Sequence, residues 1–195
     1  MKPIVLASAS PRRHEILRNA GISFTVQASH VPEIRVDGEG PIVYAERLAR
    51  EKAAEVAKDH PGKFVLGADT VVIVDGATLE KPSDAADAAR MLRLLSGKTH
   101  RVTTGVCIAS PRLRPELREL STASETTLVT MNELTEADIA AYIATGEPMD
   151  KAGAYAIQGI ASRWISRIEG DYFNVVGLPV AMVYRMLREA GALED

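Results

Sequence analysis

Short apolar runs rich in β-branched residues alternate along the chain with amphipathic stretches, whose apolar positions recur every three or four residues. The short runs predict seven strands, over residues 3–7, 22–28, 64–74, 78–80, 101–109, 126–131 and 160–168. The amphipathic stretches predict five helices, over residues 11–19, 41–60, 84–95, 136–145 and 179–190. This mixed order predicts an α/β protein with a mixed β-sheet flanked by helices.

Cap and turn residues mark where these elements begin and end. Three residues suit the N-cap position before a predicted helix: Ser10, Ser83 and Thr135. The Asp75-Gly76 pair predicts a tight hairpin between two strands. Polar or glycine-rich stretches predict loops over residues 29–40, 110–120 and 171–179. Ligands of open α/β sheets bind where such loops leave the strand ends, so we expect the site there.

Composition narrows the class of protein. Its 195 residues fit one domain spanning residues 1–195, and 46% hydrophobic with 25% charged residues is ordinary for a globular chain. Lysine and arginine total 23 against 26 aspartates and glutamates, a net charge of −3, which argues against a nucleic-acid binder. One cysteine excludes an internal disulfide. Without a signal-like start or a run of ~18 apolar residues, we expect a cytoplasmic protein with no membrane span.

Two arginines stand at the start of the first predicted helix, where the helix dipole disfavours cations by about 0.3–1 kcal/mol each. Arg12 and Arg13 fit this place if an anion binds between their side chains and the free backbone N–H groups. Ser8, in the preceding turn, adds a hydroxyl donor. Strand, serine-containing turn and paired arginines together predict a phosphate-binding site, with two solvated arginines as the alternative.

Two charged residues fall where their elements favour apolar ones. Lys52 lies on the apolar stripe of the second helix, four residues from both Leu48 and Val56. Its ammonium either points into a cleft or reaches solvent from the edge of the stripe. Asp69 interrupts the apolar run at residues 64–74, where an aspartate is typically a metal ligand, a base or a paired charge. The alternative is a turn between two strands that Asp69 caps.

Three further polar residues are ordinary by pattern alone. Glu33, in the loop after the second strand, and Lys81, before Pro82, match solvated surface residues. Gln158 is a long amide among small residues, which either satisfies backbone groups or hydrogen-bonds to the edge of a nucleobase.

Six blocks, in order along nearly the whole chain, resemble those of a known family of proteins. They are LASASPRR at residues 6–13, AREKA at 49–53, GADTVV at 67–72, LEKP at 79–82, DKAGAYAIQG at 150–159 and NVVGLP at 174–179. With these blocks the chain resembles the Maf family of nucleoside triphosphate pyrophosphatases. The resemblance implies an inosine-triphosphatase-like α/β fold, with an elongated mixed sheet and a cleft between two lobes.

The resemblance also implies a reaction, the hydrolysis of a nucleoside triphosphate to a monophosphate and pyrophosphate with a divalent cation, Mg²⁺ or Mn²⁺. In such proteins Asp69 would be the proton acceptor, and Glu33 and Asp69 would hold the metal. Lys52 and Lys81 would be the other catalytic residues. Ser8 and Arg13 would bind phosphate groups.

Base preference divides the family into branches. Arg12, Thr70 and Gln158 match the branch that prefers dTTP and UTP. The branch that prefers 7-methyl-GTP has glutamine after the aspartate and glutamate in place of Gln158. We therefore expect a dTTP/UTP pyrophosphatase that removes non-standard or excess nucleotides, from a family that often forms homodimers. A pyrophosphatase for 7-methyl-GTP or another modified nucleotide, and a nucleotide-binding regulator of septum formation, stay open as alternatives.

Overall fold

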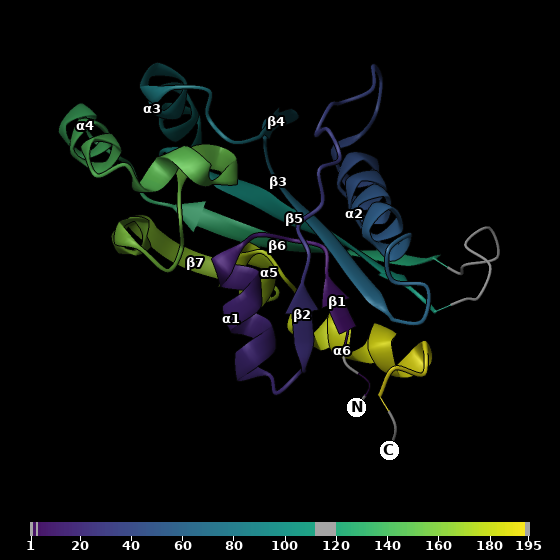
Figure 1. The fold of residues 1–195 in the computed structure, drawn as a ribbon. Helices are drawn as coiled ribbons and strands as arrows, with labels where there is room; N and C mark the ends of the chain where they lie inside the picture. Colours follow the sequence, from purple (N-terminus) through teal and green to yellow (C-terminus); the bar gives the residue numbers. More distant parts are fainter. Residues whose placement is uncertain (1, 3, 112–119, 194–195) are drawn as a thin grey trace. The chain divides into compact units, whose positions relative to one another are not determined.

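A computed structural model describes residue 2 and residues 4–111 and 120–193 of the chain (Figure 1). Its strands are β1 Ile4–Leu6, β2 Phe24–Val26, β3 Val65–Val74, β4 Ala77–Leu79, β5 Thr99–Ala109, β6 Leu120–Met131 and β7 Ile165–Glu169. Its α-helices are α1 Pro11–Asn19, α2 Pro41–Ala57, α3 Ala85–Leu95, α4 Glu136–Ala144, α5 Tyr172–Val176 and α6 Val180–Glu189. Three short 3₁₀ helices follow α4, namely η2 Glu147–Asp150, η3 Ala152–Ala154 and η4 Ile160–Trp164.

The strands form one mixed sheet in the order β2-β1-β3-β5-β6-β7, with β4 paired to β3. Strand β1 runs parallel to both β2 and β3, whereas β4 is antiparallel to β3 and β7 is antiparallel to β6. Asp75 and Gly76 both have positive φ, as the expected hairpin between β3 and β4 requires. The α/β class with a mixed sheet flanked by helices is therefore confirmed.

The described residues divide into two compact units. The first draws on Met1–Asp69, Thr104–Glu125 and Gly177–Asp195, and the second on Thr70–Thr103 and Thr126–Val176. Each unit has its own cluster of buried apolar side chains. The first cluster joins β1, β3 and β5 to α2, and the second joins β3, β5 and β6 to α3 and α4. Whether the chain acts as one domain with a cleft stays a prediction.

Two predicted elements differ from the structure because a polar contact overrides the local pattern. Residues 160–164, predicted as the first half of a strand, form η4, because the Ile160 backbone N–H donates to the Glu147 carboxylate instead of to a strand. Residues 172–176, part of the predicted loop at 171–179, form α5, because the Asp171 carboxylate accepts from the backbone N–H of Phe173 and Asn174.

Other differences concern element ends and caps. Asp84, not Ser83, is the N-cap of α3, and its carboxylate accepts from the Asp87 backbone N–H at 2.8 Å. Ser10 occupies the N-cap position of α1 without a side-chain capping bond, whereas Thr135 caps α4 through the full capping box. Helix α2 ends at Ala57, before the predicted residue 60. Strand β6 begins at Leu120, and residues 112–119 of the predicted loop lie outside the described residues.

Helix α2 lies against the sheet at a distance that only glycine allows (Figure 1). A Cβ atom on Gly67 of β3 would lie 2.1 Å from the Ala49 carbonyl oxygen, and one on Gly105 of β5 would lie 2.5 Å from that of Ala45. Ala53 also faces Gly67. Because these residues are small, α2 lies close enough to β3 for Lys52 of the helix to hydrogen-bond to Asp69 of the strand.

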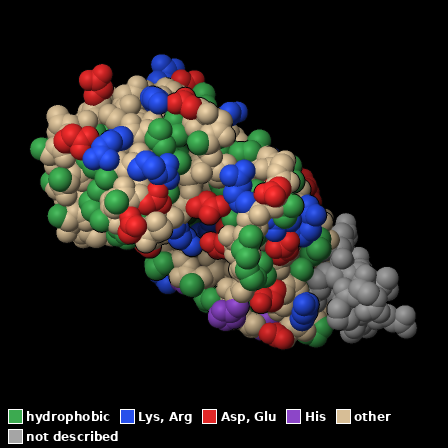
Figure 2. Space-filling model, turned by 90° about the horizontal axis from the view of Figure 1, so that it is seen from above, with side chains coloured by type: hydrophobic (Ala, Val, Ile, Leu, Met, Phe, Trp, Pro, Cys, Tyr) green, Lys and Arg blue, Asp and Glu red, His purple; other side chains and the backbone are tan. Residues whose placement is uncertain are grey.

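The surface agrees with the small net charge. On the face shown in Figure 2, basic and acidic side chains are interspersed, and no stripe of a single sign runs across it. Within the described ranges, no helix has both the length and the apolar character needed to cross a membrane.

Replacing Gly67 tests the close approach of α2. Gly67→Ala should lower the free energy of unfolding by about 1–3 kcal/mol or more, because backbone atoms of α2 cannot move aside as a flexible side chain would. Urea unfolding measures the change, with Gly62→Ala as the control, because nothing lies within 4 Å of the added methyl group there. Equal stability of the two variants would contradict the packing argument.

Candidate functional site

Asp69 lies inside an unbroken strand. Strand β3 runs from Val65 to Val74, so the alternative of a turn at this point is wrong. Side chains alternate between the faces of a strand, and Asp69 therefore points to the same face as Gly67, toward α2. It is 8% exposed, which for a carboxylate requires a charged or hydrogen-bonding partner.

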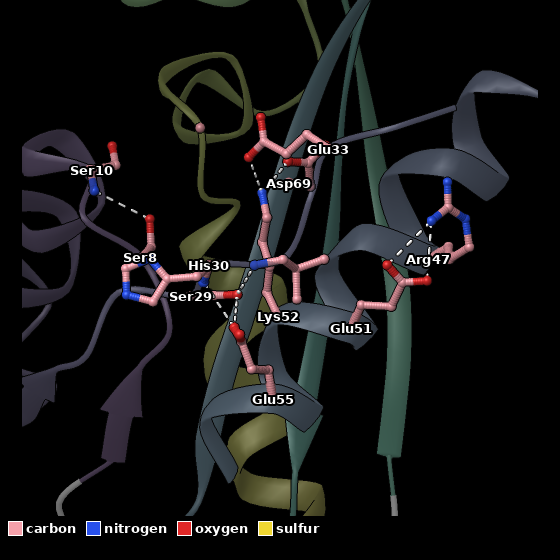
Figure 3. Close-up of polar contacts among 12 residues, drawn as sticks. Ser8, Ser10, Ser29, His30, Glu33, Arg47, Glu51, Lys52, Glu55 and Asp69 are labelled. Carbon is pink, nitrogen blue, oxygen red and sulfur yellow. Dashed lines mark hydrogen bonds and ion pairs between the residues drawn. The ribbon is translucent and has the colours of Figure 1, made fainter. Parts of the chain in front are cut away.

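Lys52 of α2 supplies that partner. Its ammonium donates to Oδ1 of Asp69 and to Oε1 of Glu33, each at 2.6 Å (Figure 3). Lys52 is only 7% exposed, so it does not extend from the apolar stripe into solvent. One buried ammonium thus joins a residue of a helix, a residue of a strand and a residue of a loop.

Opposing effects act on the protonation of this cluster. Burial raises the pKa of Asp69, and its ion pair with Lys52 and the positive charge of Arg13 act in the opposite direction. Burial lowers the pKa of Arg13, while the charges of Asp69 and Glu33 favour its charged form. Two cations and two carboxylates therefore balance in charge. A carboxylate whose pKa is raised is a stronger base than one in water.

Arg13 and Ser8 contact each other in the same unit, at the turn where a phosphate-binding site is predicted. The Arg13 guanidinium donates to the Gly177 carbonyl oxygen at 2.8 Å and to the Ser8 hydroxyl at 3.1 Å. The backbone N–H of Ser10 also donates to the Ser8 hydroxyl, at 3.2 Å. Arg13 is half-buried and its direction is fixed by these contacts, so the alternative of a solvated side chain is wrong for it. Arg12 follows the same turn and is half-buried as well.

The loop that carries Glu33 is bound to α2 at its beginning. Ser29 donates its hydroxyl proton to the Glu55 carboxylate, and the His30 backbone N–H donates to the same oxygen at 2.9 Å (Figure 3). These bonds lower the pKa of Glu55. Glu55 lies one helical turn from Lys52, so the helix that binds Glu33 also fixes the chain leading to it.

Arg47 of α2 binds the same loop near its end. Its guanidinium forms a bidentate pair with the Glu39 carboxylate at 2.7 and 2.8 Å, and it donates to the Ile34 carbonyl oxygen at 2.8 Å. It also forms an i,i+4 ion pair with Glu51, at 3.1 Å. We call residues 29–39 the Glu33 loop, which α2 therefore holds through Glu55, Lys52 and Arg47.

Sequence reasoning missed Arg47, Glu55 and Glu39. A helical i,i+4 pair with Glu51 is enough to explain an arginine at position 47. No pattern in the sequence indicates that Glu39, eight residues earlier, is a second carboxylate partner. A usable signal is the four-residue spacing of residues 47, 51 and 55, which places three charges on one face of α2 beside an otherwise unsupported loop.

The remaining predicted residues belong to the second unit. Thr70 follows Asp69 in β3 and is half-buried. Lys81 is exposed and comes two residues after β4. Gln158 is exposed and lies between η3 and η4.

A divalent cation is compatible with the residues present. The described part of the chain has no group of three or more His, Cys, Asp or Glu side chains that could hold a metal ion. Glu33 and Asp69, joined by Lys52, offer two carboxylates. Mg²⁺ is usually held by one or two carboxylates together with substrate phosphates and water, so this pair fits such an ion and does not form a complete protein cage.

Known proteins resemble this chain over nearly its whole length. The family model described as Maf-like protein matches residues 3–190. A dTTP/UTP pyrophosphatase of Koribacter versatilis is 60% identical over 97% of this chain and 95% of its own. One of Geobacter sulfurreducens is 50% identical over 97% of both chains. The solved structure of the Staphylococcus aureus Ham1 protein, 15% identical, covers 96% of this chain and 99% of its own with a TM-score of 0.50, and shows the fold alone.

Asp69→Asn should change the pH dependence of stability. Because the folded protein raises the pKa of Asp69 above its ordinary value of 3.8, the folded state binds more protons than the unfolded chain just above that pH. Wild-type stability should therefore fall as the pH rises from 3.8 through the folded pKa, and the variant should lack this loss. Urea unfolding at several pH values measures the difference. A variant that does not gain stability relative to wild type across this window would contradict the assignment.

Arg47→Met should loosen the Glu33 loop. The Glu39 side chain is 8% exposed, and losing its bidentate partner should weaken the attachment of the loop to α2. Hydrogen exchange of the backbone amides at residues 34–39 should then be about 10- to 100-fold faster. Arg93→Met is the matched control, because it removes an exposed bidentate pair with Glu136 elsewhere. Unchanged exchange at residues 34–39 would show that Arg47 does not hold the loop.

Proposed function

The chain belongs to the family of Maf-like proteins, and from this membership we propose that it hydrolyses nucleoside triphosphates, dTTP and UTP above others, to the monophosphate and pyrophosphate. The relatives named dTTP/UTP pyrophosphatases support the reaction and the substrates. The observation that carries the proposal is the buried ammonium of Lys52, which donates to both Glu33 and Asp69. The positive charge of Arg13 also acts on Asp69. A basic and acidic cluster of this kind suits phosphoryl chemistry, because it can bind anions and accept a proton.

Asp69 is the proposed general base. Its position inside β3 and its bond to Lys52 fix the direction of the carboxylate, and its raised pKa strengthens it as a proton acceptor. It would orient a water molecule and take its proton as the oxygen attacks the α-phosphorus. The bond from the α-phosphorus to the bridging oxygen then breaks, and the electron pair leaves with pyrophosphate. General-base catalysis of this kind contributes about 10²–10⁴-fold in rate.

The cations have separate proposed roles. Arg13 and the Ser8 hydroxyl bind phosphate oxygens from the turn that their mutual bond keeps in place. Arg12, beside them, adds a second guanidinium. Lys52 holds both carboxylates in position through its two hydrogen bonds. Lys81 stabilises the charge on the leaving pyrophosphate.

Glu33 and Asp69 are the proposed ligands of Mg²⁺ or Mn²⁺. Such an ion, when bound, would neutralise phosphate charge and polarise the phosphoryl group. The Glu33 loop would then serve to deliver one of its two carboxylates. Its three attachments to α2 restrict where that carboxylate can lie, and restricted ligands lose less entropy when an ion binds.

Base preference is the finer part of the proposal. The side-chain amide of Gln158 offers both N–H donors and a carbonyl acceptor, which complement the O4 and N3–H of uracil and thymine. A glutamate at the same place would offer acceptors only. Thr70, which like Gln158 belongs to the second unit, is also a proposed substrate-binding residue. We also propose that the protein acts in the cytoplasm, where its one cysteine, the buried Cys107, stays a thiol.

Pyrophosphate release from a panel of triphosphates tests the proposal. The panel contains dTTP, UTP, CTP, GTP and 7-methyl-GTP, each with Mg²⁺, with Mn²⁺ and with a chelator. We expect dTTP and UTP to be preferred, turnover to stop with the chelator, and Asp69→Asn to lower kcat by about 10²–10⁴-fold while the fold persists. Far-ultraviolet circular dichroism of the variant serves as the control for folding.

Other outcomes lead to definite alternatives. A preference for 7-methyl-GTP would keep the chemistry and overturn the interpretation of Arg12, Thr70 and Gln158 as residues of the dTTP/UTP-preferring branch. Full activity of Asp69→Asn would remove the proposed base. Tight nucleotide binding without turnover of any triphosphate would favour the nucleotide-binding regulator instead.

A further inference from the structure

A tight turn over residues 156–159 carries Gln158. The Gly159 backbone N–H donates to the Ala156 carbonyl oxygen at 3.1 Å, which closes the turn. Ile157 is 8% exposed and points inward, whereas Gln158 is exposed. The turn therefore anchors itself with one side chain and presents the next one to solvent, so the direction of the Gln158 amide depends on how the turn is held.

One pair of side chains holds the turn on both sides. The Ala156 backbone N–H donates to the Tyr142 hydroxyl oxygen at 3.2 Å, and the Ile160 backbone N–H donates to Glu147 Oε1 at 3.1 Å. The Tyr142 hydroxyl in turn donates to Glu147 Oε1 at 2.8 Å. The first residue of the turn and the residue that follows it are thus bound to a single tyrosine–glutamate pair.

Gly159 makes room for this pair. A Cβ atom at this position would lie 2.1 Å from Glu147 Oε1. The φ of Gly159 is −106°, which any residue can adopt, so backbone conformation does not require the glycine. Glycine is required at position 159 because the Glu147 carboxylate packs directly against its Cα, where a side chain would otherwise lie.

The pair itself is rigidly placed. Tyr142 of α4 is 1% exposed, and its ring packs edge-on against Trp164 at a centroid distance of 5.4 Å. Glu147 is the first residue of η2, and its carbonyl oxygen accepts from the Lys151 ammonium at 2.6 Å. Burial and the Glu147 carboxylate raise the pKa of Tyr142, so its hydroxyl stays protonated and able to donate.

We infer that Tyr142 and Glu147 are positioning residues that fix the Gln158 turn and thereby set the base preference of the enzyme. This inference rests on the proposed function, because it concerns the nucleobase that Gln158 would recognise. An amide discriminates between bases only if its donor and acceptor are held in register with the base edge, since each hydrogen bond weakens steeply with misalignment.

Two variants test the inference. Tyr142→Phe removes only the hydroxyl group. Glu147→Ala removes the carboxylate, with Glu147→Gln as the conservative variant that can still accept from the Ile160 backbone N–H. For each variant, kcat and KM are measured with UTP and with GTP. Glu136→Gln is the matched control, because this acidic residue also belongs to α4 but pairs with the exposed Arg93.

We expect the KM for UTP to rise, and the ratio of kcat/KM for UTP to that for GTP to fall about tenfold in Tyr142→Phe and Glu147→Ala. Glu147→Gln should recover part of the ratio, and Glu136→Gln should leave it unchanged. Hydrogen exchange at the Ala156 and Ile160 amides should be faster in the first two variants. This exchange readout needs no turnover.

Three results would overturn the inference. If both substrates lose activity equally, the pair has a structural role only. If Gln158→Ala lowers the UTP to GTP ratio and Tyr142→Phe and Glu147→Ala do not, the proposed function stands and the positioning role fails. If wild type releases pyrophosphate from neither UTP nor dTTP, the proposed function itself fails and this inference fails with it.

Discussion

The first unit depends on burying one ammonium between two carboxylates. A lysine can be enclosed among apolar side chains only if its charge is paired and its donors are satisfied, because removing a charge from water is otherwise too costly. Lys52 meets that condition through Glu33 and Asp69. The pairing in turn requires glycine at position 67, so that α2 can approach β3, and it requires a loop that brings Glu33 back over the helix. Helix packing and loop conformation thus follow from one electrostatic requirement.

Both units use side chains to hold the loops that carry the proposed functional residues. In the first unit, Arg47 and Glu55 of α2 bind backbone and side-chain groups of the Glu33 loop. In the second, Tyr142 and Glu147 bind the backbone on either side of Gln158, at Ala156 and Ile160. Neither loop pairs with a strand of the sheet, so a few charged or hydroxyl groups on helices contribute to its conformation beside the loop's own turn bonds. Loops held in this way can place a polar group accurately while the rest of their surface stays exposed.

The sequence predicted most of this arrangement where residues break a local rule. Asp69 and Lys52 were identifiable because charges are rare in a β-forming run and on an apolar helical stripe, and the structure joins them directly. The pattern alone could not show whether Gly67 forms a turn or allows a helix to pack closely against the strand, because glycine is common in both situations. Residues 160–164 were predicted as strand, since their apolar character is local and their bond to Glu147 is not. Contacts such as that of Arg47 with Glu39 depend on how a loop returns to its helix, which no local pattern records.

A crystal structure of the protein with Mg²⁺ and the non-hydrolysable α,β-imido analogue of UTP tests the central claim most directly. The account predicts that phosphate oxygens contact Arg13 and Ser8, that the ion binds Glu33 and Asp69, and that the Asp69 carboxylate faces the α-phosphorus. A triphosphate bound away from the Lys52, Glu33 and Asp69 cluster would contradict it, because the buried ammonium would then serve only the packing of α2 against the sheet.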